Sequence, residues 1–332
     1  MGTAFRLPDK KRRSPTCGKT MRRWPFQAYL FLIITTMCWG GNAVAGKMAV
    51  GHISPLLLTT LRWSIAFATI IVFALPCLKR DWPVIRRNLP LLAAYGAIGF
   101  TAFNALLYTA LQYTTAINVA IEQAAMPLVI FLANFVLFRI AVSAGQVIGF
   151  FMTLVGVALT VSNGDPIRLF ELQLNRGDAM MVLAVLVYGG YTVALRFKPD
   201  IHWLSMMAML AGAALLTSLP LAGYEMATGA MILPDTQGWL VALYTGLFPS
   251  LIAQVLYIRG NELIGSNRAG LFINLVPIFG TLFAVTILFE PLHLYHVVSL
   301  ALVIGGISLA EWSRSGTPGQ QLTSGGRKDA AR

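Results

Sequence analysis

Two charged residues stand inside long apolar stretches of the sequence, where a charge is costly. Arg62 lies in the run from Ser54 to Pro76, and Glu122 lies in the run from Ala116 to Phe138. If both runs are helices that cross a membrane, a rise of about 1.5 Å per residue places Arg62 roughly 12 Å and Glu122 roughly 9 Å from their outer ends. Arg62 can bind a carboxylate there, and Glu122 can bind a proton or an ammonium group.

Two interpretations of this pair are open at this stage. In the structural one, Arg62 and Glu122 neutralise each other and hold two helices together; in the functional one, they form a gate or a coupling site. Asn104, about 10 Å from the outer end of its own apolar run, and Trp39 are predicted to share the same layer.

Uncharged polar side chains interrupt the other apolar runs, and they suit hydrogen bonding and aromatic contact with a modest polar ligand. Each of them also fits a simpler role as a contact between helices. With the layer above, the residues predicted to bind substrate are Trp39, Asn42, Arg62, Asn104, Tyr108, Glu122, Tyr188, Tyr191, Gln254, Tyr257 and Asn274.

Proline and small residues inside the runs indicate bends and close packing. Pro127 and Pro277 each remove a helix hydrogen bond, which makes them hinges or static kinks. The stretches Gly145 to Gly149 and Ala301 to Gly305 are small-residue faces. They favour close packing within the chain over dimerisation, although a homodimer is left open.

Motifs of enzymes and of ATP-driven pumps are absent from the sequence: no HExxH, GxSxG or GxxxxGK[ST] pattern occurs. The three cysteines are too scattered for a disulfide framework or a metal site. We therefore predict no catalytic residue, no metal and no cofactor. A membrane-embedded enzyme is the least favoured function.

Composition places the chain in a membrane. Apolar residues make up 57%, charged residues only 11%, and the mean hydropathy is +0.70, whereas soluble domains carry about 25% charged residues. Spans of roughly 20 apolar residues recur along the chain, which excludes a β-barrel. The predicted spans are 26–46, 54–76, 89–111, 116–138, 144–161, 177–195, 202–223, 239–258, 269–289 and 293–312.

The distribution of positive charge predicts the orientation. With the N-terminus inside, the inner segments hold 21 of the 25 Lys and Arg residues, and Lys47, Arg168 and Arg176 lie outside. Both termini are therefore predicted to be cytoplasmic. The net charge of +12 mostly reflects this asymmetry, so the basic N-terminal tail is interpreted as a topology anchor and not as a nucleic-acid site.

The chain repeats itself. Tyr188 to Arg196 matches Trp39 to Lys47 at an offset of 149, sharing Gly-Gly and Val-Ala, and Leu256-Tyr257 matches Leu107-Tyr108. After one inserted residue the offset is 150 and pairs Pro127 with Pro277. Because five spans is an odd number, two consecutive copies must be inverted in the membrane, an arrangement typical of alternating-access transporters.

These residues resemble the drug/metabolite transporter superfamily, of the EamA-domain type. The resemblance covers about Phe26 to Trp312, and its carriers include Trp39-Gly-Gly-Asn-Ala-Val-Ala-Gly-Lys47, Asn274-Leu-Val-Pro277 and Phe289-Glu-Pro291. The first copy has Arg139-Ile140 where the second has Phe289-Glu290, which argues against a symmetric role for Glu290. The resemblance implies export of amino acids, their derivatives or other small metabolites.

We thus expect an all-α integral membrane protein of the inner membrane, with ten transmembrane helices as two inverted five-helix repeats. Its expected partners are a small-molecule substrate, membrane lipid and a coupling proton, with no nucleic acid. A secondary transporter, acting as an exporter, is favoured over a passive facilitator or channel. The expected segments are a tail at 1–25, a repeat at 26–162, a loop at 163–176, a repeat at 177–312 and a tail at 313–332.

Overall fold

The structure is a computed structural model that describes residues 25–139, 143–165, 175–264 and 272–315. Over these residues it is all helical and contains no strand. Eight helical segments are long and apolar enough to cross a membrane, and 276–287 and 294–310 are shorter apolar helices. The predicted all-α membrane class is therefore confirmed for the part of the chain that is described.

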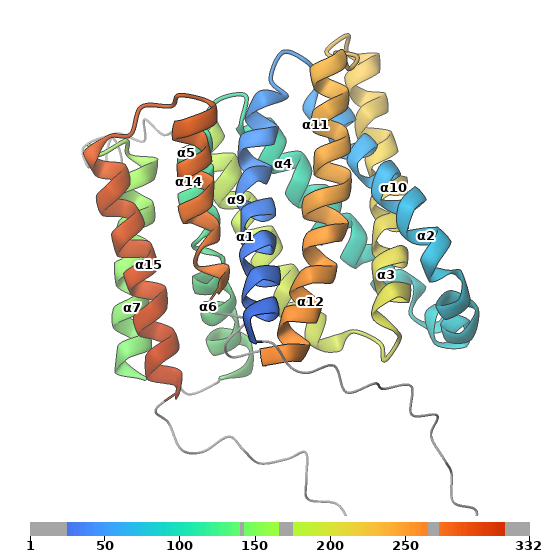
Figure 1. Ribbon diagram of the computed structural model, residues 1–332, viewed down its shortest axis with the longest axis horizontal. Coiled ribbons are helices and arrows are strands. Elements are labelled where there is room, and N and C mark those ends of the chain that lie inside the picture. Colours follow the sequence, from blue (N-terminus) through green and yellow to red (C-terminus); the bar gives the residue numbers. More distant parts are fainter. Residues whose placement is uncertain (1–24, 140–142, 166–174, 265–271, 316–332) are drawn as a thin grey trace, which may run out of the picture.

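Successive helical segments run alternately up and down, so that α1 begins and α15 ends at the same face of the bundle (Figure 1). The first half contains α1 (Pro25–Met48), α2 (Pro55–Arg87), α3 (Leu89–Tyr95), η1 (Gly96–Ala102), α4 (Phe103–Ala110), α5 (Ala116–Gln123), α6 (Met126–Phe138) and α7 (Ala144–Val161). The second half contains α9 (Arg176–Ala194), η2 (Leu195–Phe197), α10 (Trp203–Ala227), α11 (Thr236–Leu247), η3 (Phe248–Ile252), α12 (Ala253–Ile264), α14 (Val276–Ile287) and α15 (Leu294–Ser315).

The second helix is longer than its sequence predicts. The predicted span ends at Pro76, but α2 continues to Arg87 with Pro76 and Pro83 inside it. A proline at an internal position leaves one carbonyl unpaired and bends a helix without necessarily ending it. The basic residues Lys79 to Arg87, expected in a loop, therefore lie on the last turns of α2.

The predicted span 116–138 is interrupted. α5 ends at Gln123 and α6 begins at Met126, with Pro127 in the first turn of α6. Pro277 takes the same place in the first turn of α14. A first-turn proline removes no hydrogen bond, because that N–H has no partner within a helix. The two prolines thus start helices and do not kink continuous ones.

The backbone repeats further features at the same spacing. Arg139, after α6, and Phe289, after α14, both have a positive φ, of 51° and 55°. The π-helical segments η1 and η3 widen the third helix of each half. A π-turn disrupts the regular hydrogen-bond ladder, and such turns are frequent at functional sites.

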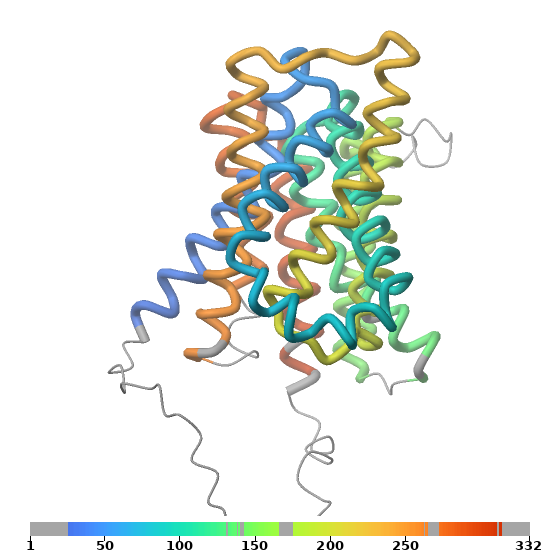
Figure 2. Tube along the Cα trace, turned by 90° about the vertical axis from the view of Figure 1, so that its right-hand side faces the viewer, coloured from blue at the N-terminus to red at the C-terminus, as the bar shows by residue number. Residues whose placement is uncertain are grey.

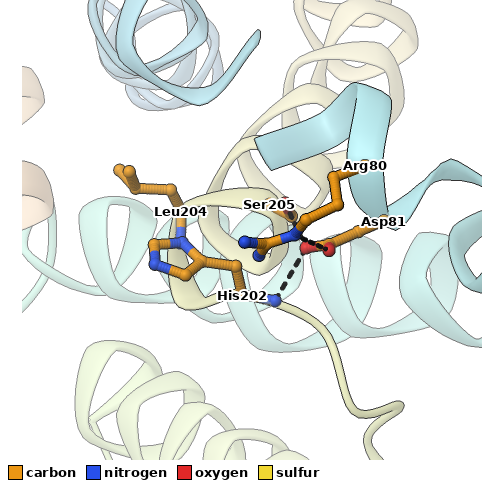
Figure 3. Close-up of polar contacts among 5 residues, drawn as sticks. All are labelled: Arg80, Asp81, His202, Leu204 and Ser205. Atoms are coloured by element: carbon orange, nitrogen blue, oxygen red, sulfur yellow. Dashed lines mark hydrogen bonds and ion pairs between the residues drawn. The ribbon is translucent and has the colours of Figure 1, made fainter. Parts of the chain in front are cut away.

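Helices α2 and α10 lie against each other and cap each other's first turns. Asp81, near the end of α2, accepts hydrogen bonds from the His202 N–H and the Ser205 hydroxyl, each at 2.8 Å, at the start of α10 (Figure 3). Glu225, near the end of α10, accepts from the Leu56 and Leu57 N–H groups at the start of α2, each at 2.9 Å. Carboxylates at these two N-termini satisfy backbone donors that a helix leaves unpaired.

Helices α7 and α15 pack closely at the opposite end of the long axis (Figure 1). A Cβ atom added to Gly149 would lie 2.3 Å from the Gly306 carbonyl oxygen, and one added to Gly156 would lie 2.9 Å from the Ser299 carbonyl oxygen. The small-residue face of α7 therefore packs within the chain, as the sequence predicts.

Helices α1 and α9 also make contacts between the two halves. α1 packs against α12 and α14, and α9 packs against α4 and α6. The face opposite the start of α1 and the end of α15 carries the connections between α1 and α2 and between α10 and α11 (Figure 2). Fully buried apolar side chains gather near that face, including Ile53, Leu58, Leu111 and Ile117.

Candidate functional site: a central cavity between the two halves

A cavity of about 450 Å³ lies in the middle of the bundle and is lined by residues of both halves. This volume falls in the usual range for a small-molecule site. Eight of the predicted substrate-binding residues line it: Trp39, Asn42, Arg62, Asn104, Tyr188, Gln254, Tyr257 and Asn274. Pro127 and Pro277 also line it. Tyr108, Glu122 and Tyr191 do not belong to its lining.

Arg62 is held in the cavity wall by a hydrogen-bond network. Its Nη1 donates to Asn42 Oδ1 at 2.6 Å and also to the Tyr108 hydroxyl, and that hydroxyl donates to Asn42 Oδ1 at 3.1 Å. The Arg62 guanidinium also lies 5.2 Å from the centre of the Trp63 ring. The network joins α2, α1 and α4. Tyr108 does not line the cavity, but its hydroxyl contacts Arg62 from behind the wall.

Two polar atoms of the cavity wall have unused hydrogen-bonding capacity. Within the described part of the chain, neither Arg62 Nε nor Asn104 Oδ1 has a hydrogen-bond partner. The Asn104 side-chain amide donates to the Phe100 carbonyl at 2.7 Å, which turns its carbonyl oxygen the other way. Both atoms are themselves buried, although their residues line the cavity, so a ligand that bonds to them requires a small shift of these side chains.

Aromatic rings form much of the remaining wall. The Trp39 indole N–H donates to the Pro249 carbonyl at 3.1 Å, and the Trp39 ring lies 5.4 Å from that of Tyr257. The Trp63 ring stacks on Phe100 with ring centres 4.4 Å apart. These rings offer apolar and cation-attracting surface beside the Arg62 network.

Tyr188 and Tyr191, both predicted to bind substrate, take different positions on α9. Tyr188 lines the cavity and its ring lies 4.7 Å from that of Phe103. Tyr191 is buried beside η1, where a Cβ on Gly99 would lie 2.4 Å from its ring. Tyr191 therefore packs helices together behind Tyr188.

Glu122 lies behind the cavity, next to the lining residues Gln123 and Ala124. It is 1% exposed, and neither carboxyl oxygen has a hydrogen-bond partner in the described residues. The ion pairs found there are His52 with Asp235 and Arg80 with Asp81. The structure therefore does not bring Arg62 and Glu122 together as a salt bridge.

Sequence reasoning missed the neighbours of Glu122. Asp178, on α9, is 0% exposed and contacts α5 one turn before Glu122. It accepts hydrogen bonds from Thr114 and from Asn118, and Asn118 also contacts His296. Asp178 is the second residue of the predicted span 177–195, so it counted as a helix end. The sequence shows an acidic residue at the second position of an apolar run, but its contact with α5 depends on how the helices pack.

Glu290 has a clear structural role. Its carboxylate accepts hydrogen bonds from the Ala116 and Ile117 N–H groups, at 2.8 and 3.0 Å, and so caps α5. The corresponding residue of the first copy, Ile140, lies outside the described residues. No group of three or more His, Cys, Asp or Glu residues that could hold a metal ion occurs in the described ranges.

The helical fold and its central cavity are those of a polytopic membrane protein. The profile of the EamA-like transporter family matches residues 26–162 and again residues 175–312. Together these matches cover most of the chain, which therefore belongs to the EamA-like transporter family. It is a multi-pass membrane transporter of this type.

Relatives with similar sequences are named as transporters. The chain is 26% identical over 288 residues to "Uncharacterized transporter YetK" of Bacillus subtilis, covering 84% of this chain and 85% of that protein. It is 25% identical to "Uncharacterized transporter YyaM" of the same organism, covering 85% and 92%. An "Uncharacterized transporter" of Archaeoglobus fulgidus is 24% identical over 295 residues, covering 85% and 96%.

A solved crystal structure shares the fold. It covers 87% of this chain and 98% of its own, with a TM-score of 0.59 at 22% sequence identity. At this identity the likeness concerns the fold alone.

Proposed function

We propose that this protein is a secondary transporter that exports small polar metabolites, such as amino acids or their derivatives, by alternating access between two inverted repeats. The observation that carries the proposal is the central cavity, which residues of both halves line and where Arg62 is held ready for an anionic group. The family assigns transport, and the cavity suggests the kind of cargo.

Ten transmembrane helices in two inverted halves are part of the proposal. Support comes from the paired features of the backbone: the breaks before Pro127 and Pro277, the positive φ at Arg139 and Phe289, and the reciprocal caps of α2 and α10. An inverted repeat makes each half the structural counterpart of the other, so rocking one against the other exposes a fixed site alternately to each side.

We infer that the cavity in this conformation faces the cytoplasm. Its lining extends to Thr192 and Leu195, near the end of α9, and to Met207, near the start of α10. The end of α9 and the start of α10 lie at the face where α1 begins and α15 ends (Figure 1), which the charge distribution assigns to the inner side. The opposite end is closed by packed side chains, among them Leu58, Leu111 and Ile117.

Arg62 is the residue we assign to substrate recognition. A guanidinium in the wall of a partly apolar cavity forms strong charge-assisted hydrogen bonds with a carboxylate. Asn104 and Gln254 supply uncharged polar groups, and the surrounding rings accept the apolar part of the cargo. An amino acid or a derivative that keeps its carboxylate fits this combination.

The test is counterflow in proteoliposomes that contain the full-length protein and a preloaded mixture of amino acids. We expect saturable exchange for at least one component, and a loss of at least about tenfold in the rate for Arg62→Gln, equivalent to about 1.4 kcal/mol. Arg86→Gln is the matched control, because Arg86 is an exposed residue of the same helix. Non-saturable flux without counterflow would show a channel and overturn the proposal.

A further inference from the structure

Behind the cavity, helices α5, α9 and α15 enclose a polar cluster that the substrate site does not use. Glu122 is 1%, Asp178 0%, Asn118 2% and His296 2% exposed. None of these residues lines the cavity. The cluster lies within the first two turns of α5 and α9, at the outer ends of these helices.

The hydrogen bonds of the cluster have a defined direction. The His293 backbone N–H lies 3.1 Å from His296 Nδ1, which must therefore be an acceptor. His296 Nε2–H then donates to Asn118 Oδ1 at 3.2 Å, and the Asn118 amide donates to Asp178 Oδ1 at 3.4 Å. The Thr114 hydroxyl donates to the same Asp178 oxygen. The chain of hydrogen bonds thus ends at Asp178 Oδ1, which accepts from both Asn118 and Thr114.

The two acidic residues are therefore not equivalent. Asp178 receives hydrogen bonds on Oδ1, whereas its Oδ2 and both oxygens of Glu122 have no partner among the described residues. An ionised carboxylate without a hydrogen-bond partner or a counter-charge is very costly to bury, and two neighbouring carboxylates also repel each other. Glu122 is the member that must carry a proton when the helices are packed in this way.

The helices packed against α5 carry few positive charges that could neutralise an ionised Glu122 in place of that proton. α7, α14 and the adjoining α6 contain no Asp, Glu, Lys, Arg or His. On α1, Lys47 donates to the Leu111 and Thr114 carbonyls and interacts electrostatically with Glu290.

The other titratable groups around the cluster are also placed by the structure. Glu290 and His293 lie before α15, Glu290 on the first N–H groups of α5 and His293 at the turn that leads to His296. Arg176, at the start of α9, is exposed. None of these groups forms an ion pair with Glu122 or Asp178.

We propose that Glu122 and Asp178 form a proton-binding site separate from the substrate cavity, with Glu122 as the proton carrier and Asp178 as its positioned partner. Thr114, Asn118 and His296 hold Asp178 from the outer side. The ligand of this site is a single proton, which binds a Glu122 carboxylate oxygen without breaking any other bond.

Proton release from Glu122 has a structural consequence. Two adjacent carboxylates without a counter-charge cannot stay packed between α5 and α9, so loss of the proton favours separation of these helices and entry of water. α5 ends at Gln123, and Gln123 and Ala124 line the cavity. Movement of α5 therefore changes the cavity wall directly and couples the proton to the conformation of the transporter.

This inference rests on the proposed transport function only for the coupling step, so protonation and transport are tested separately. The first experiment records infrared difference spectra of the full-length protein in lipid across a pH titration. We expect wild-type protein at neutral pH to show the carbonyl-stretching band of a buried protonated carboxyl, and Glu122→Gln to lose that band. Asp178→Asn should keep the band but shift its frequency, because the neighbouring acid is gone.

Glu225→Gln is the matched control, because Glu225 is another buried glutamate whose carboxylate accepts three hydrogen bonds. Its substitution should leave the Glu122 band unchanged. If Glu122→Gln does not fold, Glu122→Asp retains a carboxyl and should show a shifted band. No protonated-carboxyl band in wild-type protein, or an unchanged band in Glu122→Gln, would overturn the proposal.

The second experiment measures amino-acid transport in proteoliposomes with and without a pH gradient. We expect Glu122→Gln to lose the dependence on the gradient and to retain exchange at equal pH. Full gradient dependence in Glu122→Gln would overturn the coupling role. Saturable transport without the wild-type carboxyl band would refute the proton site and leave the transporter, and the band without any transport would refute the transporter alone.

Discussion

The two halves of this protein share a backbone plan but differ in chemistry at matching positions. Arg62 and Glu122 occupy the first half, and at the repeat offset the second half has Ala211 and Phe272. Ala211 is fully buried, and Phe272 stacks on Tyr29 with ring centres 5.7 Å apart. The repeat supplies a shared framework, and Arg62 and Glu122 have no charged counterpart at the matching positions of the second half.

If the protein works by alternating access, as we propose, this difference gives its two halves unequal roles. A proton on Glu122 or a substrate bound to Arg62 favours one conformation over another only if it binds the two with different affinity. The second half contributes Gln254, Tyr257 and Asn274 to the cavity, none of which carries a charge at neutral pH.

The largest effect is expected when a positive charge is introduced in the second half, at the position that matches Arg62. Ala211→Arg places a cation at a site that is 0% exposed and offers none of the partners that Arg62 has. Burying an unpaired charge costs several kcal/mol, so we expect the variant to be misfolded in detergent by size-exclusion chromatography. Ala211→Met, similar in length but uncharged, is the control. Native elution and stability of Ala211→Arg would show that the halves are interchangeable at this position.

A second comparison uses paired glycines at an offset of 149. A Cβ on Gly41 would lie 2.4 Å from the Tyr244 hydroxyl, whereas a Cβ on Gly190 would meet nothing within 4 Å. We expect Gly41→Val to lower the free energy of unfolding by about 1–3 kcal/mol through overpacking. Gly190→Val should change it by less than about 0.5 kcal/mol. Equal effects in denaturant titrations would contradict the difference in packing.

Removing one hydroxyl tests the Arg62 network itself. Tyr108→Phe deletes an acceptor for Arg62 and a donor to Asn42 while keeping the ring. We expect a loss of about 1 kcal/mol in stability together with slower transport. Tyr113→Phe, at an exposed ring, should have no effect on either. A Tyr108→Phe protein with wild-type transport would remove the network from the mechanism.

Pro127 and Pro277, at matching positions of the two halves, provide the next comparison. Because Pro127 and Pro277 lie in first turns, replacing either by Ala restores no lost hydrogen bond, and we expect stability to change by less than about 1 kcal/mol. If they act as hinges, transport rates in proteoliposomes fall for both variants. A normal rate in both would make these prolines purely structural.

The smallest effect is expected at Asp235, just before α11 and away from Arg62 and Glu122. Asp235 accepts a hydrogen bond from His52, which lowers the pKa of Asp235, and the Gly238 N–H adds to this. A lowered pKa in the folded state stabilises it above the unfolded pKa, and this is lost as the pH falls through the folded value. We expect Asp235→Asn to lower the melting temperature slightly at neutral pH and not at strongly acidic pH. A difference that grows in acid would contradict this.

The fold was largely predictable because apolar runs and a repeat offset are explicit in the sequence. The ends of the helices were less predictable. Pro76 suggested the end of a helix, but α2 continues beyond it, and the break before Pro127 lies within one continuous apolar run. Eight cavity residues were predicted because polar side chains inside apolar runs are conspicuous. Asp178 was missed because a contact between α5 and α9 depends on how the helices pack, which no pattern along one helix reveals.

The central claim is that the cavity opens to one side at a time and that this conformation faces the cytoplasm. The most direct test replaces the three native cysteines by serine, introduces one cysteine at Gln254 or Asn274, and measures labelling by an impermeant thiol reagent from each side of oriented vesicles. Our account predicts labelling from the cytoplasmic side alone at rest, and from the outer side only when transport is driven. Labelling from both sides at once, or from the outer side at rest, would contradict it.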